Sequence, residues 1–267
     1  DSSFNISEDR LSAMLAVTNR IYYYSDNSLS TMIRSTVTDR MENYGYESTN
    51  TGFSVGTNFE QYDDFLISPT LAMGVESLKT NQKASDNLKK QEGSYFDATI
   101  FYQLDYDKRN QKWQTSEGFR SKFTQSIPIV SDNWAMLNGY DYTQWINFDN
   151  DLITKIDFYG RAKNSISGDD IRVSERLHLP SKRLKGFVSR AIGPIDGEDY
   201  VGGNFSAAIN FSSTLPMILE SFENADFKFF IDAANVWGVD YRDNYDDSNN
   251  CLLYTSPSPR DQRGSGF

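Results

Sequence analysis

The sequence predicts an all-β protein, because apolar and polar residues alternate along much of the chain and helical periodicity is scarce. Residues 97–106 show the pattern: Ala98, Ile100 and Tyr102 fall on one face of a strand, and Thr99 falls on the other. Aromatic side chains, which favour strands, make up 14% of the 267 residues. These observations indicate a protein built from strands.

The alternation and its polar interruptions divide the chain into ten expected strands. In chain order they cover residues 11–18, 28–40, 45–59, 64–79, 94–109, 117–127, 133–148, 151–166, 204–215 and 225–238. The polar turn at 25–27 separates the first two strands. Apolar stripes mark later ones, such as Phe65 and Ile67 in the fourth and Phe205 and Ala207 in the ninth.

Strand length and loop length leave two architectures open. Several strands are longer than the roughly 9–11 residues with which a tilted strand crosses a bilayer. Short turns alternate with longer loops at 80–93 and 167–203, which is typical of outer-membrane barrels. A soluble β-sandwich has the same alternation, usually in shorter strands. The pattern alone supports a transmembrane barrel and a soluble sandwich about equally.

Charge and hydropathy limit the possible partners. The net charge is −11, whereas a protein that binds nucleic acid needs a basic surface. No apolar stretch is long enough for a transmembrane helix. A membrane is still possible, because lipid-facing and lumen-facing residues alternate in a barrel. We therefore expect no nucleic-acid partner and leave a membrane partner open.

Catalytic and metal-binding motifs are missing from the sequence. His178, the only histidine, has no nucleophile or metal ligand at a recognisable spacing and is expected on the surface or in a loop. The acidic run 243–247 lacks the glycine and the terminal glutamate of an EF-hand calcium loop. We therefore expect no enzyme activity, no cofactor and no metal.

Several motifs occur in a distinctive order. They are Leu-Lys-Gly-Phe at 184–187, Gly-Gly-Asn at 202–204 and Phe-Phe-Ile-Asp-Ala-Ala-Asn-Val-Trp at 229–237, together with Ala16–Asn19, Tyr22–Tyr24, Ser126–Pro128 and Ile192–Pro194. With these motifs, residues 11–240 resemble the barrel domain of the bacterial surface antigen superfamily, to which outer-membrane assembly factors belong.

The resemblance implies an antiparallel transmembrane β-barrel of the outer-membrane type, present here incompletely. The family's barrel has sixteen strands, and this chain would supply about ten, from the fourth to the thirteenth, with a long inward loop at 167–203. The missing strands leave two unpaired edges. We therefore expect a curved open sheet, in which pairing between 11–18 and 225–238 would be an artefact of truncation.

Both ends of the chain indicate a fragment. Cys251, the only cysteine, opens the run at 251–261, which resembles the in-frame translation of a sequencing adapter. A natural tail rich in proline and serine is the alternative. We expect residues 1–250 to form the partial barrel domain and residues 251–267 to be a non-native tail. The chain begins at Asp1 rather than Met, so we expect a longer natural protein.

The resemblance also implies a site that holds the loop inside the barrel. In the family, Val/Leu-Arg-Gly-Phe in the loop meets an acidic residue of the wall, because a charge-assisted hydrogen bond is strong in a confined lumen. The matching residues are Lys185, Gly186, Phe187 and the wall residue Asp232. Supporting positions are Arg183, Arg190, Gly193, Gly202, Gly203, Asn204, Asn210 and Trp237.

Three positions depart from the family pattern. Lys185 stands where arginine is usual and cannot make its planar two-point contact. Asn210 occupies a commonly acidic position, and Ala234 replaces a glycine. We expect an anchored loop with a different network, in which Lys182, Arg183 or Arg190 shares the arginine's role. The alternative is that Lys185 is an exposed charge without a partner.

The resemblance implies assembly and insertion of outer-membrane β-barrel proteins without nucleotide hydrolysis. The expected partners are the outer-membrane bilayer, nascent outer-membrane β-barrel proteins and accessory lipoproteins bound through POTRA domains outside this chain. The expected location is the outer membrane of a Gram-negative bacterium. Alternatives are an autotransporter-assembly factor or polypeptide secretion pore of the same superfamily, and a soluble or surface β-sandwich that binds a partner.

Overall fold

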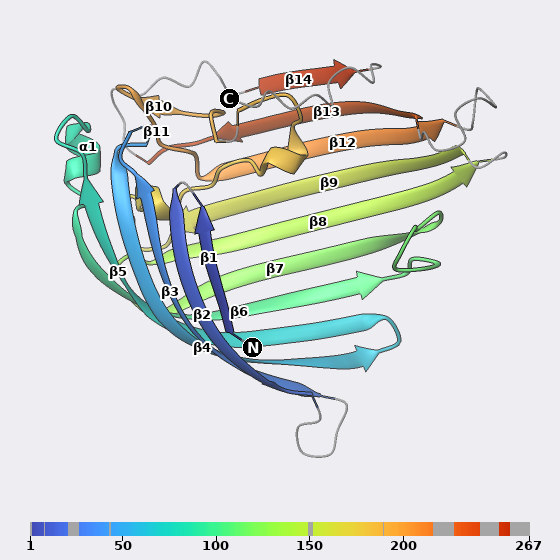
Figure 1. Cartoon of the computed structure of the whole chain (residues 1–267), viewed down its shortest axis with the longest axis horizontal. Helices are drawn as coiled ribbons and strands as arrows, with labels where there is room; N and C mark the ends of the chain where they lie inside the picture. Colours follow the sequence, from blue (N-terminus) through green and yellow to red (C-terminus); the bar gives the residue numbers. More distant parts are fainter. Residues whose placement is uncertain are drawn as a thin grey trace.

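The computed structural model describes residues 2–7, 9–20, 27–42, 44–148, 152–188, 190–215, 227–240 and 251–256. Its main element is one antiparallel sheet of twelve strands, ordered β1-β2-β3-β4-β5-β6-β7-β8-β9-β12-β13-β14 (Figure 1). The strands are β1 (Ser2–Ser7), β2 (Arg10–Asn19), β3 (Ser28–Arg40), β4 (Tyr46–Tyr62), β5 (Phe65–Thr80), β6 (Gly93–Asp107), β7 (Gly118–Ser131), β8 (Ala135–Phe148), β9 (Leu152–Ser165), β12 (Phe205–Leu215), β13 (Phe227–Trp237) and β14 (Cys251–Ser256).

The ten expected strands are confirmed as β2–β9, β12 and β13, with ends that shift by a few residues. The strand expected to stop at residue 127 continues to Ser131, because a register shift accommodates Pro128. Beyond Ser126, β7 pairs with β6 but not with β8, so the missing amide hydrogen of Pro128 interrupts no ladder on that side.

Two strands of this sheet were not expected. β1 is short and lies at the edge of the sheet, where it pairs only with β2. β14 pairs with β13 and begins at Cys251, inside the segment expected to be non-native. An edge strand pairs through backbone groups whatever its side chains are. The pairing therefore does not test the origin of residues 251–267, which stays a prediction.

The sheet is curved and open. Its edges are β1 and β14, and β2 does not pair with β13, so the expected open sheet is confirmed. These twelve strands form one continuous sheet, and the other sheet in the described part of the chain is the short pair β10 (Ile195–Asp196) and β11 (Asp199–Tyr200). Two strands of two residues each are too small to form the second layer of a sandwich, so the sandwich alternative is wrong. The aromatic cluster at 22–24 and the acidic run 243–247 lie outside the described residues.

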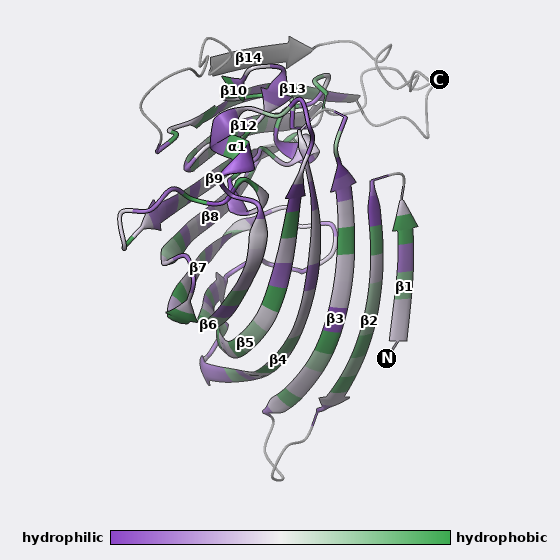
Figure 2. Ribbon diagram, turned by 90° about the vertical axis from the view of Figure 1, so that its left-hand side faces the viewer, coloured by the Kyte–Doolittle hydropathy of each residue, from purple (hydrophilic) through white to green (hydrophobic). Residues whose placement is uncertain are grey.

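The outer face of the sheet is apolar and exposed. A row of cross-strand neighbours runs through Leu15, Ile33, Phe53 and Met73, which are 63%, 53%, 38% and 42% exposed. Figure 2 shows apolar positions alternating with polar ones along β1–β5. Exposed apolar rows of this extent are typical of a surface covered by lipid or a partner.

Aromatic rings form a belt on the same outer face, near the short turns. Tyr62, Phe65, Tyr106, Phe119 and Tyr142 contact one another in succession, with ring centroids 5.5–6.5 Å apart. Aromatic rings gather in this way at the boundary between hydrocarbon and water in transmembrane barrels. The belt runs across five neighbouring strands, β4 to β8.

The inner face carries the long loop between β9 and β12. The loop contains the short 3-10 helices η2 (Val173–Glu175) and η3 (Ser181–Arg183) and the hairpin β10 (Ile195–Asp196) and β11 (Asp199–Tyr200). A second loop, between β5 and β6, contains α1 (Asp86–Lys89). Among the described residues, no helix is long and apolar enough to span a membrane.

Candidate functional site

The loop between β9 and β12 returns to its starting point through a narrow neck. The amide of Leu177 donates to the carbonyl of Gly203 (2.8 Å), and the amide of Gly203 donates back to Leu177 (2.9 Å). Beyond this bridge the chain passes over the inner face, where η3 contacts β12 and β13 (Figure 1). The loop residues after η3 therefore lie against the inner face of the sheet, which is the wall of the barrel. We call them the tip of the loop.

Lys185 contacts the wall residue Asp232 at the tip. Its backbone amide and its Nζ both donate to Oδ2 of Asp232, at 3.3 Å and 3.1 Å. Asp232 is fully buried, whereas the Lys185 side chain is 49% exposed and lies 4.1 Å from the ring centre of Phe230. The alternative of Lys185 as a charge without a partner is therefore not what the structure shows.

Asn210 joins the two sides of this contact. Its Nδ2 donates to Oδ1 of Asp232 (2.8 Å) and to the carbonyl of Arg183 (2.7 Å). A carboxylate could accept hydrogen bonds at this position but could not donate them. Asparagine at a commonly acidic position thus avoids a second negative charge beside Asp232 and holds the loop backbone.

Arg183 contacts two wall carboxylates at once. Its guanidinium donates to Asp141 of β8 (3.1 Å) and lies 3.0 Å from the carboxylate of Asp157 of β9. It also lies 4.9 Å from the ring centre of Tyr159, and only 7% of the residue is exposed. Two carboxylates on neighbouring strands suit the fork of an arginine.

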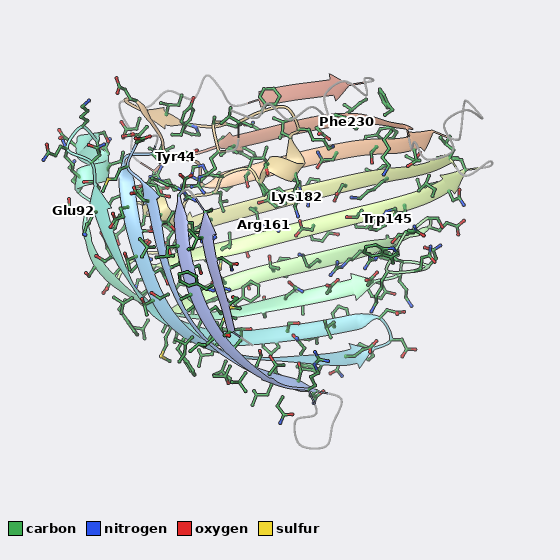
Figure 3. The ribbon with its side chains drawn as sticks, in the orientation of Figure 1. Tyr44, Glu92, Trp145, Arg161, Lys182 and Phe230 are labelled. Carbon is green, nitrogen blue, oxygen red and sulfur yellow. The ribbon has the colours of Figure 1, made fainter. Side chains whose placement is uncertain are left out.

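The wall acids also pair with cations of the wall itself. Arg161 donates to Asp141 at 2.6 Å, Lys122 lies 3.7 Å from the same carboxylate, and Lys155 contacts Asp157 at 2.9 Å. Arg161 and Lys182 are labelled in Figure 3. We call Arg183, Lys185, Asp141, Asp157, Asn210 and Asp232 the tip cluster.

An apolar contact supports the tip cluster. Leu184, only 2% exposed, packs with Tyr159, Ala208, Ala234 and other buried residues, and Phe187 packs against the same group. Ala234, which replaces the family's glycine, is itself buried in this group. Leu184 and Phe187 thus seat the tip on the wall by excluding water from apolar surface.

Glycines let the loop backbone approach the wall closely. Gly186, Gly193 and Gly202 have φ of +79°, +109° and +71°, where side chains are strained. A Cβ on Gly193 would lie 2.9 Å from Val236, and a Cβ on Gly203 would lie 2.5 Å from the backbone of Trp237. These positions need glycine for conformation or for space.

The remaining predicted positions lie away from the tip. Asn204 donates to Asp240 (2.6 Å), and Trp237 stacks on Phe205 with ring centres 5.7 Å apart. Arg190 contacts the hydroxyl of Tyr46 (3.4 Å). Of the three cations that flank the motif, Arg183 is the one that contacts wall carboxylates within the described part of the chain.

The only histidine, His178, lies in the loop as expected. Its ring nitrogens are buried, and its ring meets that of Tyr44 edge to face, 6.1 Å between centres. Burial, reinforced by the nearby guanidinium groups of Arg190 and Arg40, holds the pKa of His178 well below its usual value. The ring is therefore neutral, and no catalytic partner contacts it among the described residues.

A cavity of about 260 Å³ lies beside the tip cluster. It is lined by Lys155, Asp157, Lys182, Arg183, Lys185, Asn210, Phe211, Ser212 and Asp232. No group of three or more potential metal ligands occurs among the described residues. The cavity is polar and holds both signs of charge, so it suits ordered water and ion pairs between loop and wall.

Sequence reasoning missed the partners of Arg183. Asp141 lies in the middle of a strand and belongs to no distinctive motif. Asp157 was recognised only as one of several charged residues on its strand. A signal did exist: a carboxylate on the inner face of a strand needs a cation or a hydrogen-bond donor as its partner. Only the fold identifies that partner as Arg183.

Comparisons with known proteins agree with this geometry. A model of the Omp85 superfamily domain matches residues 2–262. None of the curated proteins matches the chain. A solved structure, the crystal structure of BamA from Haemophilus ducreyi lacking POTRA domains 1–3, has the same fold, with a TM-score of 0.78 at 16% identity.

The extent of these matches matters for function. The structural match covers 89% of this chain and 51% of the BamA chain, so this chain spans about half of that chain's length. The superfamily match confirms the family expected from the loop and strand motifs. It also extends beyond residue 250 into the segment expected to be non-native.

Proposed function

Because the chain belongs to the Omp85 superfamily, we propose that it forms the central part of an outer-membrane barrel that folds and inserts other outer-membrane β-barrel proteins. The tip cluster is the observation that carries this proposal. An inserting barrel must change shape at its seam without losing the order of its lumen, and a loop fixed to the wall provides that order.

The proposed location is the outer membrane of a Gram-negative bacterium. The exposed apolar rows of the outer face and the belt from Tyr62 to Tyr142 support it, because lipid stabilises such rows and interfacial rings. The proposed partners are the bilayer and unfolded outer-membrane proteins. Accessory lipoproteins would bind through POTRA domains in the longer protein.

The proposed mechanism is physical rather than chemical. The barrel thins and perturbs the bilayer and offers a strand edge, whose unpaired amide and carbonyl groups template an incoming strand. During this exchange Arg183 and Lys185 keep the loop on β8, β9 and β13. No step requires a nucleotide or a metal.

The test uses the full-length protein that contains this segment, reconstituted in liposomes with an unfolded outer-membrane barrel protein. We expect it to accelerate insertion of that substrate several-fold over protein-free liposomes. Lys185→Ala should reduce the acceleration and lower the temperature at which the barrel unfolds on a gel. Lys108→Ala is the matched control, since Lys108 pairs with Asp64 at 2.6 Å but lies outside the loop.

Two results would contradict the proposal. Transport of a soluble polypeptide across the membrane without insertion of barrel substrates would favour the secretion-pore alternative. Equal insertion rates and equal heat stability for wild type and Lys185→Ala would remove the role of the tip cluster.

A further inference from the structure

A second group of charges joins the neck of the loop to another part of the wall. The guanidinium of Arg172, 2% exposed, lies 3.6 Å from Glu76 of β5 and 2.8 Å from Glu175, and it donates to Asp97 of β6. Lys163 of β9 contacts Glu175 at 3.0 Å. We call Arg172, Glu175, Glu76, Asp97 and Lys163 the neck cluster.

The neck cluster is distinct from the tip cluster. Lys163 and Asp157 both belong to β9 and are six residues apart, so the two clusters lie roughly 20 Å apart along that strand. No residue belongs to both. The neck is therefore fixed by contacts of its own.

Polar side chains of neighbouring loops also hold the neck. Gln91, from the loop between β5 and β6, accepts from the amide of Val173 (2.8 Å) and donates to Asp170 (2.8 Å). Asn133, from the turn after β7, donates to the carbonyl of Asp170 (2.7 Å). These bonds satisfy backbone groups that the irregular neck would otherwise leave unpaired.

An apolar cluster lies under the same segment. Its buried members are Tyr46, Leu78, Ala84, Leu88, Val173 and Val201, with Tyr44 and Tyr95 packed against them. Of the buried members, Val173 and Val201 come from the long loop, and the other four come from β4, β5 and the loop that contains α1. The neck thus has its own small core on the β4–β6 side of the sheet.

The other side of the neck contacts the end of β13. The amide of Ile171 donates to Asp240 (3.0 Å), and the side chain of Asn204 donates to the same carboxylate (2.6 Å). Asp240 lies three residues after the end of β13, whereas Glu76 and Asp97 belong to β5 and β6. The strands β7, β8, β9 and β12 separate these two groups within the sheet.

We propose that residues 170–176 form a cross-brace that fixes the separation of β5–β6 from β13 at the rim of the barrel, with Arg172 as the positioning residue at one end and Asp240 at the other. A curved sheet with unpaired edges can flex through small changes of twist between neighbouring strands. A contact between distant strands across the inner face limits the total change of twist that the strands between them can add up. The cross-brace does not depend on which polypeptide the barrel handles.

The test measures the distance between two spin labels on the outer face of the full-length protein in lipid. Labels replace Val75 of β5 and Ile209 of β12, which are 49% and 54% exposed, after other cysteines are removed. We expect one narrow distance distribution for the wild type. Arg172→Met and Asp240→Ala should each broaden it at least two-fold.

The double variant separates a brace from two independent contacts. A brace works only while both of its ends are attached, so loss of either end removes its effect. Arg172→Met combined with Asp240→Ala should therefore broaden the distance distribution no more than the larger of the two single changes. A sum of the two single effects would overturn the proposal. If Arg172→Met does not accumulate as a folded barrel, Asp240→Ala and Arg172→Lys replace it, with the same expectation for the first and a smaller broadening for the second.

Two control variants test whether the effect is specific. Arg120→Met removes an inner-face ion pair with Asp105 on the adjacent strand (2.5 Å) and should leave the distribution narrow. Arg183→Met removes the tip contacts and should also leave it narrow at this rim. Equal broadening by either control, or an unchanged distribution in Arg172→Met, would overturn the cross-brace.

Discussion

The tip cluster and the neck cluster fasten the same loop in different ways. At the tip, Lys185 is half exposed beside a polar cavity, and the wall acids have other cations near them. At the neck, Arg172 is buried over an apolar core and faces three carboxylates. The difference indicates that the tip can be released by local rearrangement, whereas the neck holds as long as the surrounding core holds.

The largest expected effect is at the neck. Arg172→Met leaves the buried Glu76 and the half-buried Asp97 and Glu175 with Lys163 as the one remaining cation of the cluster. It should lower the free energy of unfolding by about 4 kcal/mol. Urea unfolding of the full-length protein in lipid, followed by tryptophan fluorescence, measures it. Arg172→Lys keeps the charge and should cost less. If Arg172→Met lowered the free energy of unfolding less than Arg183→Met does, the tip and not the neck would be the stronger attachment.

Arg183→Met should have a smaller effect, about 2 kcal/mol in the same measurement. The reason is that Arg161 and Lys122 still neutralise Asp141, and Lys155 still neutralises Asp157. Proteolysis should then cut the loop at its tip sooner than in the wild type. If the tip remains protected, the tip is not held by Arg183.

Gly193→Ala tests how closely the loop must approach β13. Gly193 and Gly197 both have positive φ, but a Cβ meets Val236 at 2.9 Å only at Gly193, and meets nothing within 4 Å at Gly197. The Gly193 variant should therefore be less stable than Gly197→Ala by about 1 kcal/mol. Equal thermal midpoints for the two variants would show that the loop backbone moves away from Val236 at little cost in stability.

The smallest effect is a pH dependence at the neck. Burial and the neighbouring carboxylate of Asp240, opposed by Arg176, raise the pKa of Asp170 to about 6. The folded protein then binds more protons than the unfolded chain between about pH 4 and pH 6. Stability from this group should fall as the pH rises through that window, by up to about 1 kcal/mol after screening by water.

Asp240→Asn is the variant that checks this assignment. Removal of the neighbouring charge should lower the pKa of Asp170 and flatten the dependence of the unfolding free energy on pH between 4 and 6. The same slope in wild type and variant would assign the dependence to another group.

The three cations that fix the loop differ in how well their contacts could be predicted from the sequence. The contact of Lys185 with Asp232 was expected, because both residues lie in motifs at family positions. The role of Arg183 was one of three possibilities, since three cations flank the motif and no spacing rule distinguishes them. Arg172 was not expected, because its partners are up to 96 positions away and belong to strands whose inner face shows no motif.

The strands in the middle of the sheet were predicted from the sequence, whereas the two edge strands were missed. β2–β9, β12 and β13 were predictable, because each alternates between an exposed apolar face and an inner face. β1 was missed because it has only six residues at an edge, and β14 was missed because its segment was set aside as non-native. Register shifts such as the one at Pro128 also depend on which neighbours are present.

The sequence by itself determined that the chain forms strands of alternating character, to which family they belong and which residues mark the inward loop. These properties follow from local patterns of side chains. Only the tertiary structure decided that Arg183 joins β8 and β9 and that the neck joins β5 and β6 to the end of β13. Such contacts depend on the curvature of the whole sheet, which brings together residues that no local pattern relates.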